Sequence, residues 1–224
     1  MEIRGLERRL SGNTNYSPGR EERDLVLIGH DRSSLVVDSF CDQTRGQNTV
    51  VSHFYFDFRA RKEQTATNML GSLVKQMVRT MERIPEEILR VFEEQRRTIG
   101  GRRPQLVDLV KILRTIVSSR PTIICIDAMD ECAGEQRFWL LNSLKQILQQ
   151  SPGTRIFMTG RPHILAEVQS HLAGQVISVS INPPKSDIKR YLHARLVQDE
   201  TPDAMDKSLE AEILERIPEN ISGR

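Results

Sequence analysis

The chain has few cysteines and no long hydrophobic segment. Its 224 residues include only 3 cysteines, which are too few for the disulfide framework of a small secreted protein. No run of about 18 apolar residues occurs, so we expect no transmembrane helix and no membrane partner. The opening residues, MEIRGLERRLSG, lack the apolar core of a signal peptide. These absences predict a cytoplasmic protein.

Neither sign of charge predominates. The 32 Lys and Arg residues are balanced by 30 Asp and Glu residues, which gives a net charge of +2. This balance excludes a strongly basic nucleic-acid-binding arm and an acidic tail. The arginines at 96–97 and 102–103 have no aromatic residues between them, so we interpret them as a solvated face. We therefore expect no nucleic-acid partner.

Short apolar runs alternate with helical stripes along the chain. Alternation of this kind is typical of an α/β fold with a parallel sheet and crossover helices. One of the helical stripes, between residues 106 and 117, repeats with i, i+3, i+4, i+7 spacing. We predict a sheet of about five strands, at Leu25–Ile28, Val50–Phe58, Thr122–Ile126, Arg155–Thr159 and Gln175–Ile181.

Three acidic residues follow the most apolar of these strands. Asp127 comes directly after Ile123–Ile126, at the carboxyl end of the strand, where open α/β sheets bind ligands. A carboxylate there can hold Mg²⁺ beside the phosphates of a nucleotide. Asp130 and Glu131 are close enough in sequence to orient or deprotonate a water molecule. The alternative is that Asp130 and Glu131 only cap the next helix.

A second strand ends in a hydroxyl group and a basic side chain. Thr159 closes the apolar run that begins at Ile156, and Arg161 follows two residues later. In a parallel sheet both would lie near the end of the Asp127 strand. Arg161 could then contact a γ-phosphate with two nitrogens. The alternative is a surface arginine that precedes the turn-forming Pro162.

The segments IICIDAMDEC and RIFMTGRP resemble the Walker B and sensor segments of the NACHT family, the STAND-type signal-transduction NTPases. The nephrocystin-type N-terminal NTPase domain, abundant in fungal proteins, is the most similar group. The segments VVSHFYFDFR, ARKEQTATNMLGSLVKQM and SDIKRYLHARL also resemble it, so the resemblance covers about residues 34–222.

This resemblance implies a P-loop NTPase core of the AAA+-like branch that binds ATP or GTP with Mg²⁺. It implies that Asp127 is the magnesium ligand, Asp130 and Glu131 are the catalytic acids, and Arg161 is the sensor arginine. The expected domains are a disordered polar tail at 1–23, the NACHT-like core at 24–182 and the truncated start of a helical subdomain at 183–224. Within the core, residues 59–121 form a helical excursion.

The Walker A loop of that family, G-x-x-x-x-G-K-[ST], has no full counterpart. Its glycines let backbone amides surround the phosphates, and its lysine neutralises their charge. The matching segment here, GHDRSS, has one glycine, Gly29, and no lysine. Arg32 and Ser33 take the place of the Lys-Ser pair, although arginine is a planar fork rather than a point charge. Asp31 would repel phosphate, so we predict impaired nucleotide binding.

These observations favour a nucleotide-dependent signalling switch whose nucleotide state gates self-association or contact with protein partners. A pseudo-NTPase that serves as an interaction domain and a partial gene product are the alternatives. Both ends of the chain look cut, since IPENISGR stops inside a helical pattern. The shortened loop has two explanations, degeneration of a former NTPase or replacement of the true loop by truncation or a divergent gene boundary.

Overall fold

The computed structural model describes residues 25–28, 33–97, 104–172, 176–179, 185–198 and 206–221. The chain divides into two compact units, Met1–Ser180 and Ile181–Arg224, which we describe one at a time. The tail expected at 1–23 and the loop residues Gly29 and Arg32 lie outside the described residues.

In the described part of the first unit, the strands form one parallel sheet in the order β2-β3-β4-β1-β5. The expected α/β class with a parallel sheet is confirmed. Three six-residue strands, β2, β3 and β4, form one half of the sheet, and the shorter β1 and β5 form the other. The strand bounds are β1 Leu25–Ile28, β2 Val50–Tyr55, β3 Thr122–Asp127, β4 Thr154–Thr159 and β5 Val176–Ser178.

Helices connect the strands of this sheet. Local capping fixes two of their starts: the Thr65 hydroxyl accepts from the backbone N–H of Asn68, and the Asp108 carboxylate accepts from that of Gln105. The helix bounds are α2 Ser33–Gln43, α3 Ala66–Arg79, α4 Glu86–Arg97, α5 Leu106–Ser119, α6 Gly134–Gln150 and α7 Leu165–His171.

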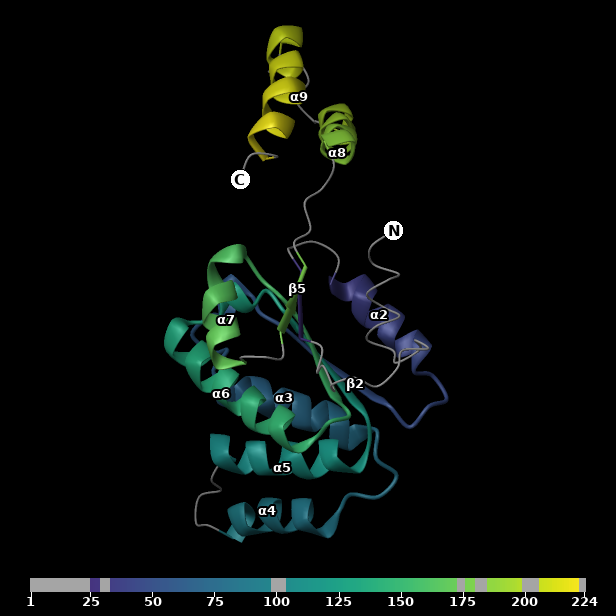
Figure 1. Cartoon of the computed structure of the whole chain (residues 1–224), viewed down its shortest axis with the longest axis vertical. Helices are drawn as coiled ribbons and strands as arrows, with labels where there is room; N and C mark the ends of the chain where they lie inside the picture. The colour runs from purple at the N-terminus through teal and green to yellow at the C-terminus, as the bar shows by residue number, and fades with distance from the viewer. Residues whose placement is uncertain are drawn as a thin grey trace. The chain divides into compact units, whose positions relative to one another are not determined.

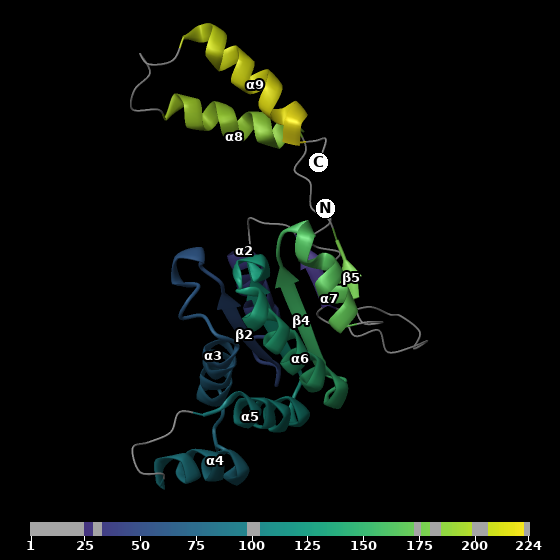
Figure 2. The same ribbon diagram turned by 90° about the vertical axis from the view of Figure 1, so that its left-hand side faces the viewer.

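The two faces of the sheet are covered by different helices. Ile123 and Cys125 of β3 pack with apolar residues of α2, whereas Ile124 and Ile126 pack into the larger core formed with α3, α5 and α6. This division follows from the alternation of side chains along a strand. Figures 1 and 2 show α2 on one side of the sheet and α3, α5 and α6 on the other. Burial on both faces explains the unbroken apolar run of β3.

The strand predicted at Val50–Phe58 is shorter in the structure. Strand β2 ends at Tyr55, and Phe58 begins a short 3₁₀ helix, η1 (Phe58–Ala60). The Asp57 carboxylate accepts a hydrogen bond from the backbone N–H of Arg59, 2.9 Å away, and so caps this turn. The aromatic composition suggested a longer strand, but the cap at Asp57 ends it.

The carboxyl edge of the sheet carries a turn after each of its three long strands. Besides η1 after β2, the 3₁₀ turn η2 (Met129–Glu131) follows β3, and η3 (Pro162–Ile164) follows β4. Because the three strands are parallel neighbours, the three turns lie at the same edge. The acidic and basic residues singled out in the sequence belong to this edge.

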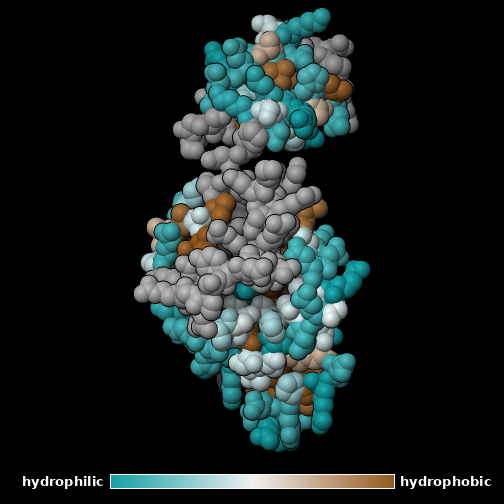
Figure 3. All heavy atoms as spheres, turned by 45° about the vertical axis from the view of Figure 1, so that its right-hand side comes forward, coloured by the Kyte–Doolittle hydropathy of each residue, from teal (hydrophilic) through white to brown (hydrophobic). Residues whose placement is uncertain are grey.

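The second unit is a pair of helices, α8 (Lys185–Val197) and α9 (Lys207–Ile221), that pack on each other. Its surface exposes apolar side chains, among them Val197 and Leu209, and Figure 3 shows hydrophobic residues among hydrophilic ones on this unit. Among the helices in the described residues, none combines the length and apolar character that a membrane crossing requires.

Candidate functional site

A hollow of about 500 Å³ lies where the three turns meet at the carboxyl edge. Each of the turns η1, η2 and η3, or the residue next to it, contributes at least one acidic or basic side chain to the wall of the hollow. The lining residues are Phe58, Arg61, Asp130, Glu131, Arg161 and His163. Three of the residues singled out from the sequence, Asp130, Glu131 and Arg161, are thus brought together at one site.

Asp127 and Thr159 join the ends of β3 and β4. The Thr159 hydroxyl donates a hydrogen bond to Asp127 Oδ1 and accepts one from the backbone N–H of Ala128, 2.9 Å away. Thr159 is buried, with 3% of its surface exposed. The sequence predicts that both residues lie at the same edge of a parallel sheet, and the pairing of β3 with β4 places them side by side. The hydroxyl fixes the position of the Asp127 carboxylate.

Replacing Thr159 by valine is expected to lower the free energy of unfolding by about 1–3 kcal/mol, because it removes a hydrogen bond to a carboxylate and leaves a buried N–H without an acceptor. Thr159→Ser keeps the hydroxyl and loses one methyl group, which costs about 1 kcal/mol. Urea unfolding followed by the fluorescence of Trp139, the single tryptophan, measures both variants. A Thr159→Val protein as stable as the unsubstituted chain would show that the hydroxyl contributes nothing.

The chain turns sharply between Asp127 and the acidic pair. Ala128 has φ 53° and ψ 46°, and it is the only residue other than glycine with a positive φ in the described residues. A left-handed conformation is unfavourable for alanine and persists only where the surrounding contacts enforce it. The hydrogen bond from its N–H to Thr159 is one such contact. The turn directs Asp130 and Glu131 to the edge of the sheet.

Asp130 is buried against Arg161. The carboxylate accepts from the backbone N–H of Arg161 at 3.2 Å and lies 3.4 Å from its Nε atom. The Asp130 side chain is 3% exposed, whereas that of Arg161 is 63% exposed. The pair therefore links η2 to the segment that enters η3, and Arg161 remains accessible from solvent.

The geometry also tests the two alternatives from the sequence, that Asp130 and Glu131 only cap the next helix and that Arg161 is a surface arginine. Helix α6 begins at Gly134 after Ala133, so neither Asp130 nor Glu131 is its N-cap residue. Arg161 does precede a proline-led turn, but its guanidinium also faces a buried carboxylate. Glu131 is half-buried and lines the hollow, where its carboxylate meets solvent.

The expected phosphate loop is described only in part. Strand β1 lies between β4 and β5, and Ile28 is the register partner of Thr159. Ser33 is the first residue of α2, while Gly29 and Arg32 lie outside the described residues. The chain therefore leaves β1 for this loop next to the end of β4.

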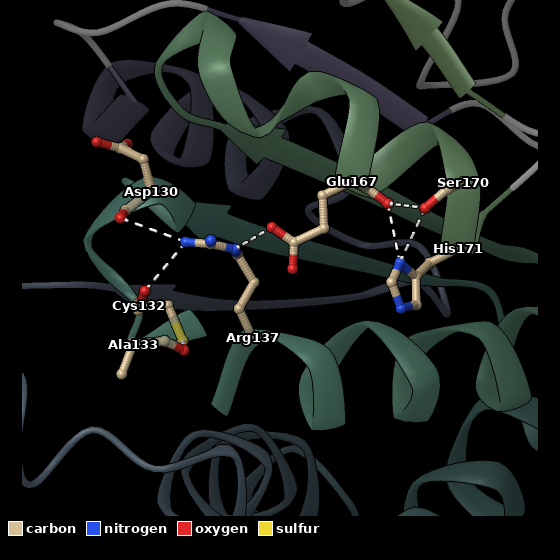
Figure 4. A network of polar contacts seen from close by, with 7 residues as sticks. All are labelled: Asp130, Cys132, Ala133, Arg137, Glu167, Ser170 and His171. Atoms are coloured by element: carbon tan, nitrogen blue, oxygen red, sulfur yellow. Dashed lines mark hydrogen bonds and ion pairs between the residues drawn. The ribbon is translucent and has the colours of Figure 1, made fainter. Parts of the chain in front are cut away.

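Two residues that support the acidic turn from behind the hollow carry no sequence signal that we recognised. Arg137 of α6 donates to Glu167 of α7 at 2.7 Å, and to the backbone carbonyls of Cys132 and Asp130 at 3.1 and 3.5 Å. Figure 4 shows the Arg137 guanidinium between these groups. Both residues lie outside the apolar stripes of their helices, so periodicity alone did not mark them.

Comparisons with known proteins show which family and fold this architecture belongs to. The family model described as nephrocystin 3, N-terminal, matches residues 32–161. A chain in a structure of Drosophila ORC bound to DNA is 14% identical with a TM-score of 0.51, and the match covers 96% of this chain and 50% of that one. This chain therefore spans half the length of the Drosophila chain.

Two archaeal structures give weaker likenesses. The Aeropyrum pernix Orc1 protein in complex with DNA is 15% identical with a TM-score of 0.49, over 88% of this chain and 48% of that one. A Walker-type ATPase of Pyrococcus abyssi is 13% identical with a TM-score of 0.44, over 97% and 65% of the two chains. No curated protein matches the sequence.

The fold is that of the P-loop NTPases, as the resemblance of the Walker B segment implied. The narrower assignments, to NACHT or STAND proteins and to fungi, stay predictions. Because the family model covers more than half of its 224 residues, the chain belongs to the nephrocystin 3, N-terminal, family.

Proposed function

We propose that the first unit is a nucleotide-dependent signalling switch that binds a nucleoside triphosphate with Mg²⁺ at the carboxyl edge of its sheet. One observation carries the proposal: Asp127, Glu131 and the Asp130–Arg161 pair gather where three parallel strands end. Open α/β sheets bind ligands at this edge. The P-loop NTPase fold supports the same location.

The donor atoms at this edge suit Mg²⁺. Among the described residues, no three His, Cys, Asp or Glu side chains gather closely enough to hold a metal ion. Magnesium commonly needs only one or two carboxylates, with water and phosphate oxygens as its remaining ligands. Asp127 would be the carboxylate that holds it, because Thr159 keeps one of its oxygens at the strand end. The bound ion would neutralise charge on the phosphates.

The two acids of η2 take different roles in this proposal. Asp130 is buried and engaged by Arg161, which suits it to hold the two turns together. Glu131 lines the hollow and is the acid that can contact water. We assign it the role of general base, accepting a proton at a carboxylate oxygen from the attacking water.

Arg161 gives the site a way to respond to its ligand. Its side chain is 63% exposed, so a phosphate group can reach it without unfolding the turn. A phosphate that draws the guanidinium away from Asp130 would loosen the contact between η2 and η3. A change at this contact would alter the surface that the two turns present to a protein partner or a second copy of the chain.

A non-catalytic interaction domain is the second candidate, and the sequence of the loop favours it. The segment GHDRSS has no lysine to neutralise the phosphates, and its Asp31 adds a repulsive charge. Under this alternative the fold and the Asp130–Arg161 pair remain, but nucleotide does not bind. The near balance of charge argues against a nucleic-acid partner, although the Drosophila relative is bound to DNA, so this absence stays a prediction.

Titration of the whole chain with a fluorescent ATP analogue distinguishes the two candidates. The switch predicts binding that saturates at micromolar concentrations in the presence of Mg²⁺ and weakens when EDTA replaces it, because the ion screens the phosphates from the acidic edge. Failure to bind at about 1 mM nucleotide, a free energy weaker than about −4 kcal/mol, would rule out the switch and favour the interaction domain.

A further inference from the structure

One guanidinium group connects the acidic turn to two helices. Arg137 lies in the first turn of α6, and its side chain is only 14% exposed. Its Nε atom donates to Glu167 Oε2 at 2.7 Å, and one terminal nitrogen donates to the Cys132 carbonyl oxygen at 3.1 Å. The Asp130 carbonyl oxygen lies 3.5 Å from the same nitrogen. The five donors of arginine in a rigid fork allow this simultaneous contact.

These contacts reach both sides of the Asp130–Arg161 pair. The carbonyls that Arg137 holds flank Glu131 in sequence, at Asp130 and Cys132. Glu167 belongs to α7, which continues directly from η3, the turn that Arg161 leads into. Figure 4 shows Arg137 lying between the acidic turn and α7. One side chain thus ties the backbone around Glu131 to the segment that follows Arg161.

We infer that Arg137, oriented by Glu167, is a positioning residue that holds the η2 backbone so that the Glu131 carboxylate faces the hollow. The inference rests on the proposed function for its catalytic consequence, but the holding of the turn can be tested without nucleotide. Arg137 touches neither Asp127 nor the hollow in the contacts above, so its effect on the reaction passes through the backbone of η2.

Cys132 is a built-in reporter for the position of this turn. It is the C-cap residue of η2 and is 1% exposed. Burial raises the pKa of its thiol to about 11, against the opposing effect of the nearby Arg137 charge. Removing Arg137 would therefore raise that pKa further and make the thiol intrinsically less reactive. Faster alkylation of Cys132 in an Arg137 variant would therefore report greater access to the thiol and not a lower pKa.

Cys125 supplies the internal control for that measurement. It lies in the middle of β3, is 3% exposed, and burial raises the pKa of its thiol as well. Opening of the whole unit would accelerate both cysteines, whereas opening of η2 would accelerate Cys132 alone. Cys41 is exposed, so its rate serves as the reference for the reagent.

The experiment alkylates the whole chain with iodoacetamide at about pH 8 and follows each cysteine by peptide mass spectrometry. Arg137→Ala is expected to raise the alkylation rate of Cys132 by about tenfold or more and to leave that of Cys125 unchanged. A hydrogen bond to a charged group shifts the equilibrium between open and closed turn toward the closed form by about this factor. Glu167→Gln should raise the alkylation rate of Cys132 by a smaller factor. Arg114→Ala is the matched control, since Arg114 also joins two helices, through Gln150 at 2.6 Å.

A parallel kinetic measurement tests the catalytic consequence at a temperature where every variant is folded. Arg137→Ala should lower kcat for nucleotide hydrolysis at least about tenfold with KM changed less than threefold, and Arg137→Lys should recover part of it. An unchanged Cys132 rate, a rise shared equally by Cys125, or an open turn with full kcat would overturn the inference. Absence of hydrolysis in the unsubstituted chain would instead remove the proposed function, and the Cys132 rate would still decide whether Arg137 holds the turn.

Discussion

Glu131→Gln is expected to lower the rate of nucleotide hydrolysis by about 10²–10⁴-fold while changing nucleotide affinity less than about twofold. A positioned general base contributes an effect of this size, and glutamine cannot accept the proton at neutral pH. Glutamine has the shape of glutamate and fits the same place on the wall of the hollow. Single-turnover release of phosphate measures the chemical step, and titration with the fluorescent analogue measures binding.

Glu135→Gln is the matched control for this variant. Glu135 is an exposed residue in the first turn of α6, four positions farther along the chain and outside the lining of the hollow. Its substitution should leave hydrolysis unchanged. A Glu131→Gln protein that hydrolyses nucleotide as fast as the Glu135→Gln protein would show that Glu131 is not the base, and Asp130 would then have to be tested in the same assay.

Asp127→Asn is expected to weaken nucleotide binding by about 10–100-fold when Mg²⁺ is present and to have little effect in EDTA. The substitution removes the negative charge that would hold the ion, and loss of one group that supports a metal commonly has an effect of this size. Asparagine keeps an oxygen that can accept the hydrogen bond from Thr159, so the strand ends should stay joined. The difference between the two titrations therefore isolates the ion.

Asp42→Asn is the control for the charge itself. Asp42 is an exposed carboxylate of α2 whose side chain is 74% exposed, beside Arg45. Asp42→Asn changes the net charge by the same amount as Asp127→Asn, but in helix α2 and not at the ends of β3 and β4. If the two variants lose affinity equally, or if Asp127→Asn loses as much in EDTA, the assignment of Asp127 to the magnesium ion is wrong.

The sequence was sufficient to predict that the strands carrying the site residues end at one edge of a parallel sheet. An unbroken apolar run is typical of a strand buried on both faces, and β3 has this pattern from Thr122 to Ile126. Parallel order then places the residues after β3 and β4 at one edge, which is why Asp127 and Thr159 could be expected to meet. These predictions depend on periodicity and topology, which a single sequence records.

The contacts that set the direction of each side chain could not be predicted in the same way. The left-handed turn at Ala128 is not marked by a glycine in the sequence. A hydrogen bond to Thr159 on the neighbouring strand helps to hold alanine in this conformation. The Arg137–Glu167 pair depends on how α6 and α7 pack, and packing angles leave no local pattern. The burial of Asp130 beside an exposed Arg161 likewise arises from tertiary structure.

Hydrogen exchange of the whole chain, with and without ATP and Mg²⁺, tests most directly whether the carboxyl edge of the sheet is the nucleotide site. We predict slower exchange in the peptides that contain residues 127–133 and 159–164, and no change in α4, which packs on α5 (Figure 2). Exchange that is unchanged in both edge peptides at saturating nucleotide, or protection confined to other parts of the chain, would contradict the account.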